Sequence, residues 1–180
     1  REKRLDIMAV AEVGPSIFPY LLKEGWLVTA CPEKGQKSLG LAILTNSKFP
    51  IIQKYTDIDT RNIGLTVKTK DSEVLFLFTY SPDLNYSKER YQQHLDTQER
   101  LIRDHQHVLM IGDMNAKLAR NQAPVTYAHG IHTFDCRNGK LLRQMCEKLH
   151  LQLENSKFST GKKRRKNQTG RHSTYISKSM

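Results

Sequence analysis

The sequence is poor in cysteine. Only Cys31, Cys136 and Cys146 occur in 180 residues, and no two of them have the short spacing of a zinc-binding or redox pair. We therefore expect reduced thiols, an intracellular protein and no structural zinc site. No apolar run is long enough to span a membrane, and residues 1–4 lead into no signal-peptide core. These absences argue against a disulfide-stabilised secreted protein and against a membrane protein.

Three further patterns are missing. The chain has no internal repeat and no glycine-rich phosphate-binding loop, which argues against a P-loop nucleotide-binding protein. Its seven histidines include no ligand pair on one helix face, so we expect most of them to be surface residues.

Acidic residues are absent from the C-terminal part of the sequence. Residues 155–180 contain eight Lys or Arg and no Asp or Glu, so they carry a formal charge of +8 out of the total of +11. Such a block favours a polyanion, and its binding should weaken steeply with salt. A solvated loop or tail and a nuclear-import signal are the alternatives. The candidate nucleic-acid-binding residues, within a predicted basic loop at 159–173, are Lys162, Lys163, Arg164, Arg165, Lys166 and Arg171.

The apolar pattern predicts a single domain over residues 1–180, because 38% hydrophobic residues in a chain of this length can form a sizeable core. The expected strands are 5–13, 39–44, 63–69, 73–80, 108–112, 151–154 and one beginning at Thr174; the expected helices are 87–103 and 138–149, capped by Ser87 and Asn138. Hairpins mixed with helices predict an α+β fold, a four-layer sandwich of two packed mixed β-sheets flanked by helices. A smaller layered α/β protein is the alternative.

The apolar run from Val108 to Ile111 ends in Gly112-Asp113-Met114-Asn115. This pattern predicts a carboxylate and a carboxamide at the open end of a strand, where a rigid element can deliver catalytic groups. If the strand continues through this segment, the i, i+2 spacing puts Asp113 and Asn115 on one face. The alternative is a strand followed by an ordinary Asp/Asn turn.

Two other strand ends carry candidate residues. Glu12 closes the first strand and is either the point where that strand meets water or, beside Asp113, a ligand for a hard cation such as Mg²⁺. Tyr80 closes the strand at 73–80 and is either a half-buried packing residue or a hydrogen-bond donor to a phosphate oxygen.

Taken in order, these segments resemble the endonuclease/exonuclease/phosphatase superfamily, with its DNase I-like fold. Within it they resemble the apurinic-endonuclease-like domains of LINE-type retrotransposons. Each motif is short, so their order and spacing along nearly the whole chain carry the resemblance. The matching segments are 5–12, 37–43, Thr79-Tyr80-Ser81-Pro82, Gly112-Asp113-Met114-Asn115 with 116–118, His129-Gly130, 137–142 and 153–158.

The resemblance implies a role for each candidate residue. Glu12 would hold a divalent cation, Mg²⁺ or alternatively Mn²⁺, which neutralises charge on a scissile phosphate. Asp113 would orient and deprotonate the attacking water. Asn115 would hydrogen-bond the phosphate, and Tyr80 would assist at the phosphate or the leaving group. This division of labour suits phosphodiester cleavage, which chiefly needs positioning and preorganised charge stabilisation.

The sequence also departs from the family pattern. Ala11 stands where Gln is usual before the Glu, and Tyr175 stands where Trp is usual in a Thr-Trp pair. Family members have an earlier strand that bears an Asn, and later Asp-Tyr and Ser-Asp-His motifs. On this basis we expect the chain to be truncated at both ends relative to the family, either as a piece of a longer protein or as a naturally shortened, degenerate copy.

The resulting functional hypothesis is a metal-dependent DNA endonuclease of the retrotransposon type, which binds DNA mainly through phosphates and acts in the nucleus. One alternative is a non-catalytic nucleic-acid-binding or interaction module that kept the fold. Another is a phosphatase of the same superfamily that acts on a small or lipid phosphate.

The basic block generates a first prediction. Replacing Lys162, Lys163, Arg164, Arg165 and Lys166 together with Gln should weaken binding to every DNA sequence alike, because phosphate contacts position a protein without reading bases. The salt dependence of the binding constant should flatten by roughly 0.9 per lost contact on duplex DNA. The unfolding temperature should hardly change, because solvated like charges contribute little to stability. Binding titrations over a salt series measure both effects, and an unchanged affinity and slope would leave only a solvated loop or an import signal.

Overall fold

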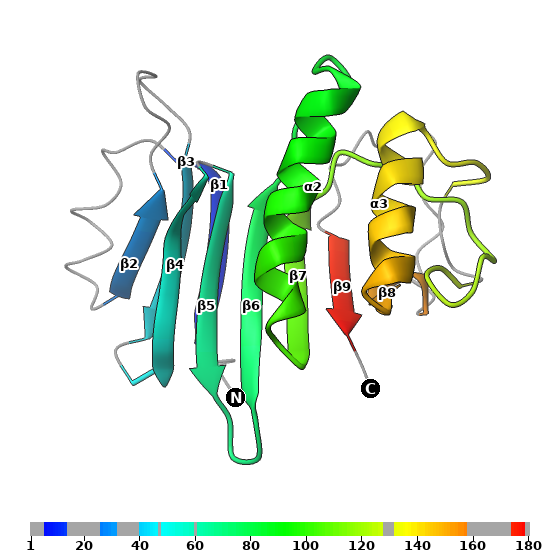
Figure 1. Ribbon diagram of the computed structural model, residues 1–180. Coiled ribbons are helices and arrows are strands. Elements are labelled where there is room, and N and C mark those ends of the chain that lie inside the picture. Colours follow the sequence, from blue (N-terminus) through cyan, green and yellow to red (C-terminus); the bar gives the residue numbers. More distant parts are fainter. Residues whose placement is uncertain are drawn as a thin grey trace, which may run out of the picture.

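A computed structural model describes residues 6–13, 26–31, 40–46, 48–59, 61–127, 132–157 and 174–178. The described strands are β1 (Ile7–Val13), β2 (Trp26–Cys31), β3 (Gly40–Asn46), β4 (Ile51–Asp59), β5 (Asn62–Lys68), β6 (Glu73–Tyr80), β7 (His107–Asp113), β8 (Leu151–Leu153) and β9 (Thr174–Lys178). They form two sheets (Figure 1). One has the order β1-β3-β2 and is antiparallel. The other has the order β4-β5-β6-β7-β9-β8 and is mixed, because β6 and β7 run parallel.

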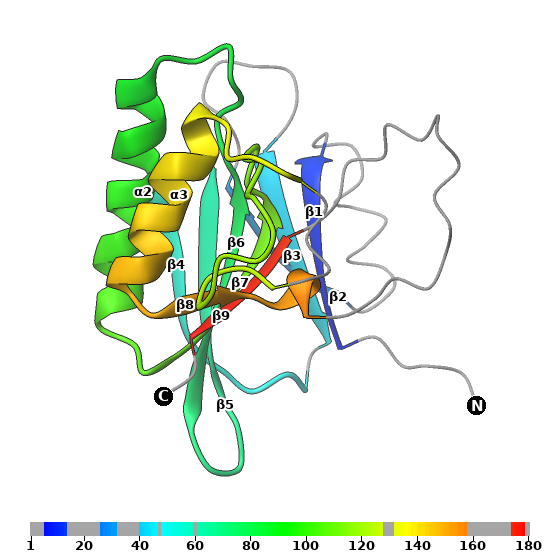
Figure 2. The ribbon, with the colours of Figure 1, turned by 90° about the vertical axis from the view of Figure 1, so that its right-hand side faces the viewer.

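The two sheets pack face to face, and helices α2 (Lys88–Arg103) and α3 (Arg137–Lys148) cover the other face of the six-stranded sheet (Figure 2). Strand β6 shows how the alternation of side chains builds both layers. Phe76 and Phe78 contact the apolar core between the sheets, whereas Leu75 and Leu77 belong to the core under the helices. Because each fully buried side chain of this kind contributes roughly 1.5–3 kcal/mol, β6 is tied firmly to both layers.

The two helices begin in different ways. Ser87 caps α2 as predicted, since its hydroxyl accepts the N–H of Arg90 at 3.2 Å. The prediction that Asn138 caps the second helix is wrong: Cys136 is the N-cap of α3, and its sulfur accepts the N–H of Gly139 at 3.4 Å. Asn138 lies inside the first turn and is buried. Its carboxamide donates instead to the carbonyls of two loops, at Pro82 and Asn115. The N-cap acceptor is therefore the Cys136 sulfur, which is a weaker acceptor than oxygen.

The predicted α+β class with two packed sheets is confirmed, although only the six-stranded sheet is mixed. Two strands were not predicted, β2 and β4, and both lie at the edge of a sheet. Edge strands bury fewer groups, and the apolar pattern of β4 is weak because it contains Gln53, Lys54, Asp57 and Asp59. Strand β2 has no charged residue, but its sequence, WLVTAC, shows no alternation of apolar and polar residues. The predicted strand 151–154 ends at Leu153, and a 3-10 turn, η2 (Glu154–Ser156), follows it. No helix in the described ranges is long and apolar enough to span a membrane.

Several strand termini meet at one end of the molecule. The parallel strands β6 and β7 finish there, at Tyr80 and Asp113. Strand β5 starts there, because it runs antiparallel to β6 with Asn62 opposite Thr79. Strand β1 also ends there, in the sheet packed behind (Figure 2). The fold therefore places the ends of the three strands that carry Glu12, Tyr80 and Asp113 in the sequence at the same end, or rim, of the molecule.

Gly112 lets β6 and β7 approach closely at this rim. Its φ is 150°, and a Cβ atom added to it would lie 1.9 Å from the carbonyl oxygen of Thr79. Any other residue would both strain the backbone and displace β6, so glycine is required where the apolar part of β7 gives way to Asp113.

Gly112→Ala should therefore lower the free energy of unfolding by roughly 3 kcal/mol, from backbone strain and a direct clash. Chemical denaturation measures this change. Gly64→Ala in β5 is the matched control, because a Cβ there would meet only side-chain atoms, the nearest being Cδ2 of Tyr55 at 3.0 Å. Side chains can move aside, so this variant should lose much less stability. Equal losses in the two variants would contradict the close approach at Gly112.

Candidate functional site

Tyr80 and Asp113 form a residue pair at the ends of β6 and β7. The pairing extends beyond the strands, because the N–H of Ser81 donates to the carbonyl of Asp113 at 2.9 Å. Tyr80 packs against the core between the sheets, as does Ile111, and the alternation along β7 assigns Asp113 to the same face as Ile111. The structure thus brings together the phenol and the carboxylate that the sequence identified on separate strands.

Asn115 lies beside this pair but not on the strand. Strand β7 ends at Asp113, and Asn115 has a φ of 44°, so the condition for a shared strand face is not met. A turn connects the two residues instead: the N–H of Asn115 donates to Oδ1 of Asp113 at 3.0 Å. The side chain of Asn115 donates from Nδ2 to the carbonyl of Ser81 at 2.6 Å. Asp113, Asn115 and the end of β6 are therefore fixed relative to one another.

Glu12 occupies an irregular position in β1. Ala11 pairs with Leu41 and Val13 pairs with Gly40, so Glu12 is the extra residue of a β-bulge. The backbone of Glu12 thus lies one residue from the end of β1; its side chain lies outside the described part of the chain. Among the described side chains, no group of three or more His, Cys, Asp or Glu could hold a metal ion.

The predicted basic loop, with Lys162 to Lys166 and Arg171, also lies outside the described residues. The strand that follows it is described: β9 begins at Thr174, which pairs with Gly112. The first residue of β9 therefore pairs with the residue directly before Asp113.

Both helices hold the two loops that carry the site. The hydroxyl of Tyr91 on α2 donates to the carbonyl of Met114 at 2.8 Å. Burial raises the pKa of Tyr91 well above its usual value, so this hydroxyl stays protonated and keeps donating. The carboxamide of Asn138 on α3 donates to the carbonyls of Pro82 and Asn115, at 3.2 and 3.1 Å. Removing either side chain would leave a carbonyl without its hydrogen-bond donor in a buried position, and the protein would lose stability because that carbonyl is no longer solvated by water.

A buried polar cluster of Asn62, Thr79, Ser81, His94 and Gln98 lies behind the rim. Nε2 of His94 lies 3.1 Å from the hydroxyls of both Thr79 and Ser81. Gln98 donates to the Thr79 hydroxyl at 2.8 Å and to Oδ1 of Asn62 at 3.0 Å. The cluster ties the end of β6 to α2. From the sequence we expected most histidines at the surface and did not identify His94 as buried. A local pattern could have shown it, because His94 and Gln98 follow Tyr91 by three and seven positions and so lie on the buried face of the helix.

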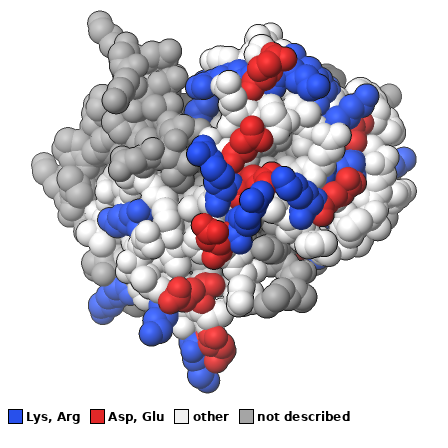
Figure 3. Space-filling model, viewed as in Figure 1, with Lys and Arg blue, Asp and Glu red and all other residues white. Residues whose placement is uncertain are grey.

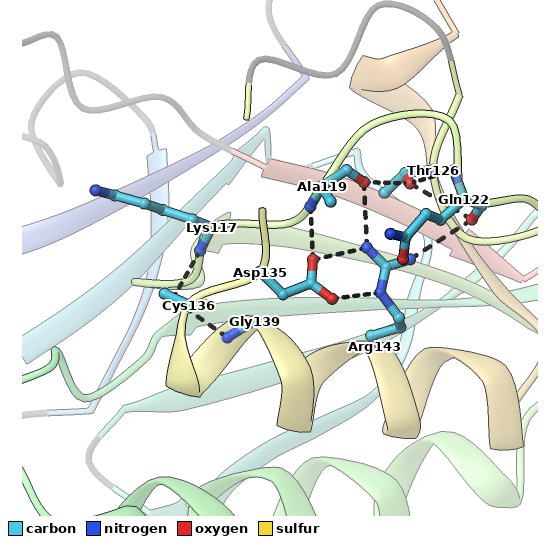
Figure 4. A network of polar contacts seen from close by, with 8 residues as sticks. All are labelled: Lys117, Ala119, Gln122, Thr126, Asp135, Cys136, Gly139 and Arg143. Atoms are coloured by element: carbon cyan, nitrogen blue, oxygen red, sulfur yellow. Dashed lines mark hydrogen bonds and ion pairs between the residues drawn. The ribbon is translucent and has the colours of Figure 1, made fainter. Parts of the chain in front are cut away.

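An ion pair between Asp135 and Arg143 anchors the segment that follows Asn115 (Figure 4). Arg143 binds the carboxylate with two nitrogens, Nε to Oδ2 at 2.7 Å and a terminal nitrogen to Oδ1 at 2.8 Å. The same groups hold Ala119: its N–H donates to Asp135 at 2.6 Å, and its carbonyl accepts from Arg143 at 3.1 Å. The hydrogen bond from Arg143 lowers the pKa of Asp135 below its usual value.

Arg61 was not identified from the sequence, yet it contacts the site directly. Its guanidinium carbon lies over the ring of Tyr80, 5.6 Å from the centroid, and over the ring of Tyr86, 5.2 Å from the centroid. It also donates to the Tyr80 carbonyl at 3.3 Å and to the Tyr86 hydroxyl at 3.1 Å. An Arg just before a strand is too common a pattern to reveal this arrangement.

The face that carries α2 and α3 shows acidic and basic side chains interspersed (Figure 3). Glu99, for example, pairs with Arg103 and with Lys148, and the Lys148 contact measures 2.6 Å. Because the charges compensate locally on this face, it does not have the single-sign character that favours a polyanion.

Comparisons with known proteins agree on the fold. A family model, the endonuclease/exonuclease/phosphatase family, matches residues 1–172. A structure of a Neisseria 3′ phosphatase, NExo, bound to a product DNA hairpin is 15% identical with a TM-score of 0.64, and the match covers 98% of this chain and 77% of that one. The endonuclease domain of TRAS1, a telomere-specific non-LTR retrotransposon, is 17% identical with a TM-score of 0.63, over 96% of this chain and 73% of that one.

Other matches are shorter. A humanized TDP2 from D. rerio is 15% identical with a TM-score of 0.49, over 61% of this chain and 49% of that one. This chain therefore spans about half the length of that structure. A search of curated proteins gave no match.

The Asp135–Arg143 pair generates a prediction about pH. The folded-state pKa of Asp135 is lowered, so its contribution to stability is complete above the unfolded pKa of about 4 and is lost as pH falls through the lower folded value. Arg143→Met should cost roughly 3 kcal/mol of unfolding free energy at neutral pH, because it leaves a largely buried carboxylate without its partner. The difference from the unchanged protein should shrink below about pH 4.

Denaturant unfolding at a series of pH values measures this dependence. Lys148→Met, which removes one partner of a more exposed ion pair, is the control and should cost less than about 1 kcal/mol at any pH. A cost for Arg143→Met that stays constant down to pH 2 would show that the ion pair is not its source.

Proposed function

The chain belongs to the endonuclease/exonuclease/phosphatase family, and from that premise we propose that it is a metal-dependent phosphodiesterase of the DNA-endonuclease type, as in LINE-type retrotransposons. The observation that carries the proposal is the rim where Tyr80 and Asp113 end paired strands and Asn115 is locked beside them. The shared fold of the TRAS1 endonuclease domain and of the DNA-bound Neisseria phosphatase supports it.

Each described residue has a group suited to phosphodiester hydrolysis. Asp113 offers a carboxylate that can orient a water and accept its proton, and the Asn115 N–H holds one of its oxygens in place. The carboxamide nitrogen of Asn115 carries two hydrogens, so it can donate to a phosphate oxygen while keeping its bond to Ser81. The Tyr80 hydroxyl can donate to the phosphate or to the leaving oxygen. Two helices fix these groups before substrate binds, and such preorganisation suits catalysis by positioning.

We assign the divalent cation to Glu12, with Asp113 nearby, and expect Mg²⁺ or alternatively Mn²⁺. Carboxylate oxygens are the ligands these hard cations prefer, and Mg²⁺ needs only one or two of them together with water and substrate oxygens. When bound, the cation supplies charge neutralisation at the scissile phosphate.

The basic segment supports DNA as the substrate. Its downstream end joins β9, and Thr174 of β9 pairs with Gly112 beside the candidate catalytic carboxylate. A polycation tethered there would attract the phosphates on either side of a cleavage site. We accordingly propose action on DNA in the nucleus.

The test is nicking of supercoiled plasmid by the 180-residue chain with Mg²⁺. Asp113→Asn and Tyr80→Phe should each lower the nicking rate, by roughly 10²- to 10⁴-fold for the Asp, because proton transfer and charge stabilisation are lost while the shape is kept. Asp71→Asn, in the exposed turn between β5 and β6, is the control and should leave the rate unchanged. EDTA should abolish nicking in all of them.

Two other outcomes identify the alternatives. Binding to DNA in EDTA that falls with salt, with no nicking by the folded protein in Mg²⁺ or Mn²⁺, would identify a non-catalytic nucleic-acid-binding module. Release of phosphate from a 3′-phosphorylated oligonucleotide or another phosphomonoester, without nicking, would identify a phosphatase. In both cases the endonuclease proposal would be wrong.

A further inference from the structure

Beside the candidate catalytic residues lies a three-layer stack, Tyr80–Arg61–Tyr86. The guanidinium carbon of Arg61 lies over both tyrosine rings, 5.6 Å from the centroid of Tyr80 and 5.2 Å from the centroid of Tyr86. Hydrogen bonds to the Tyr80 carbonyl and the Tyr86 hydroxyl fix the guanidinium in that position. The inner ring belongs to the residue that pairs with Asp113, so the stack starts at the proposed reaction centre and extends outward from it.

The outer layer of the stack is exposed. Tyr86 retains 44% of its surface, and Leu84 in the same loop retains 47%. Tyr86 belongs to neither apolar core, and its exposed surface is accessible to a ligand. Its neighbour Arg61 adds a positive charge under the ring, which strengthens its attraction for a polyanion.

The loop that carries Tyr86 is rigidly held. Arg137 at the start of α3 donates to the carbonyls of Leu84 and Tyr86, at 3.2 and 2.7 Å. Within the loop, the carboxylate of Asp83 accepts the N–H of Asn85 at 2.8 Å, and this internal bond engages the one acidic group of the loop. A surface aromatic ring that is already ordered costs little entropy when a ligand stacks on it.

From these observations, and resting on the proposed function, we infer that Tyr86 and Arg61 form a stacking site for an unpaired nucleobase next to the scissile phosphate. Bases stack on aromatic rings and on guanidinium planes whatever their identity, so the site would not select a sequence. In a regular duplex each base face is covered by its neighbours. The site therefore selects DNA in which a base next to the cleavage position is unpaired.

The experiment compares three duplex probes by fluorescence anisotropy in EDTA, where no cleavage occurs. One probe is fully paired, one has a single unpaired adenine, and one has an abasic residue at that position. The protein should bind the unpaired-base probe about tenfold more tightly than the other two, which is the usual effect of one stacked base. Tyr86→Ala should abolish this preference, Tyr86→Phe should keep it, and all variants should bind the paired probe alike.

Phe134→Ala is the matched control, because Phe134 is another exposed aromatic residue and is not a member of the stack. It should leave the preference unchanged. Equal binding of the three probes by the unchanged protein would overturn the inference, even if Tyr86→Ala failed to fold. The inference would also be overturned if the abasic probe bound as tightly as the unpaired-adenine probe, because the protein would then recognise a flexible backbone and not a base. Neither result depends on nicking, so each can be separated from a failure of the proposed function.

Discussion

The parallel pairing of β6 and β7 is the constraint on which the rest of the site depends. Parallel strands end at the same edge of a sheet, and the register here places Tyr80 opposite Asp113. The close contact at Gly112 fixes that register locally, because no other register brings a residue without a Cβ against the Thr79 carbonyl. A shift by one residue would turn every side chain of β7 to the opposite face and would bury Asp113 against the helices.

Neutral hydrogen bonds, more than ion pairs, hold this end of the sheet. Tyr91 and Asn138 donate to loop carbonyls, and Gln98 donates to the Thr79 hydroxyl behind β6. Neutral buried partners need less desolvation than charged ones and are unaffected by salt. The charged pair Asp135–Arg143 lies farther along the chain, where it orders the segment between β7 and α3. The contacts of Tyr91, Asn138 and Gln98 therefore do not compete with a bound polyanion for charge.

The sequence predicted those parts of the molecule that local patterns encode. The apolar runs predicted β6 and β7, and Ser87 predicted the start of α2. The Gly-Asp-x-Asn sequence at the end of β7 identified Asp113 as the candidate carboxylate. The edge strand β4 escaped because its polar residues weaken the apolar pattern, and β2 escaped because its apolar run shows no alternation. Asn138 and Arg61 escaped because the loop groups to which they donate lie 23 to 56 and 19 to 25 positions away, respectively. Such contacts follow from the tertiary fold, so a pattern read along the chain cannot contain them.

The position of β9 has a consequence for how the chain reaches this structure. Residues 174–178 lie between β7 and β8, which precede them in the sequence, and they pair with both. Until those residues arrive, β7 and β8 each have an open edge that another chain could extend. Completing the sheet is therefore a long-range event with a substantial loop-closure entropy, and it should come late in folding. Strand β7, which carries Asp113, has an unpaired edge until β9 is in place. A partly folded chain would therefore aggregate through the edge beside its own candidate active site.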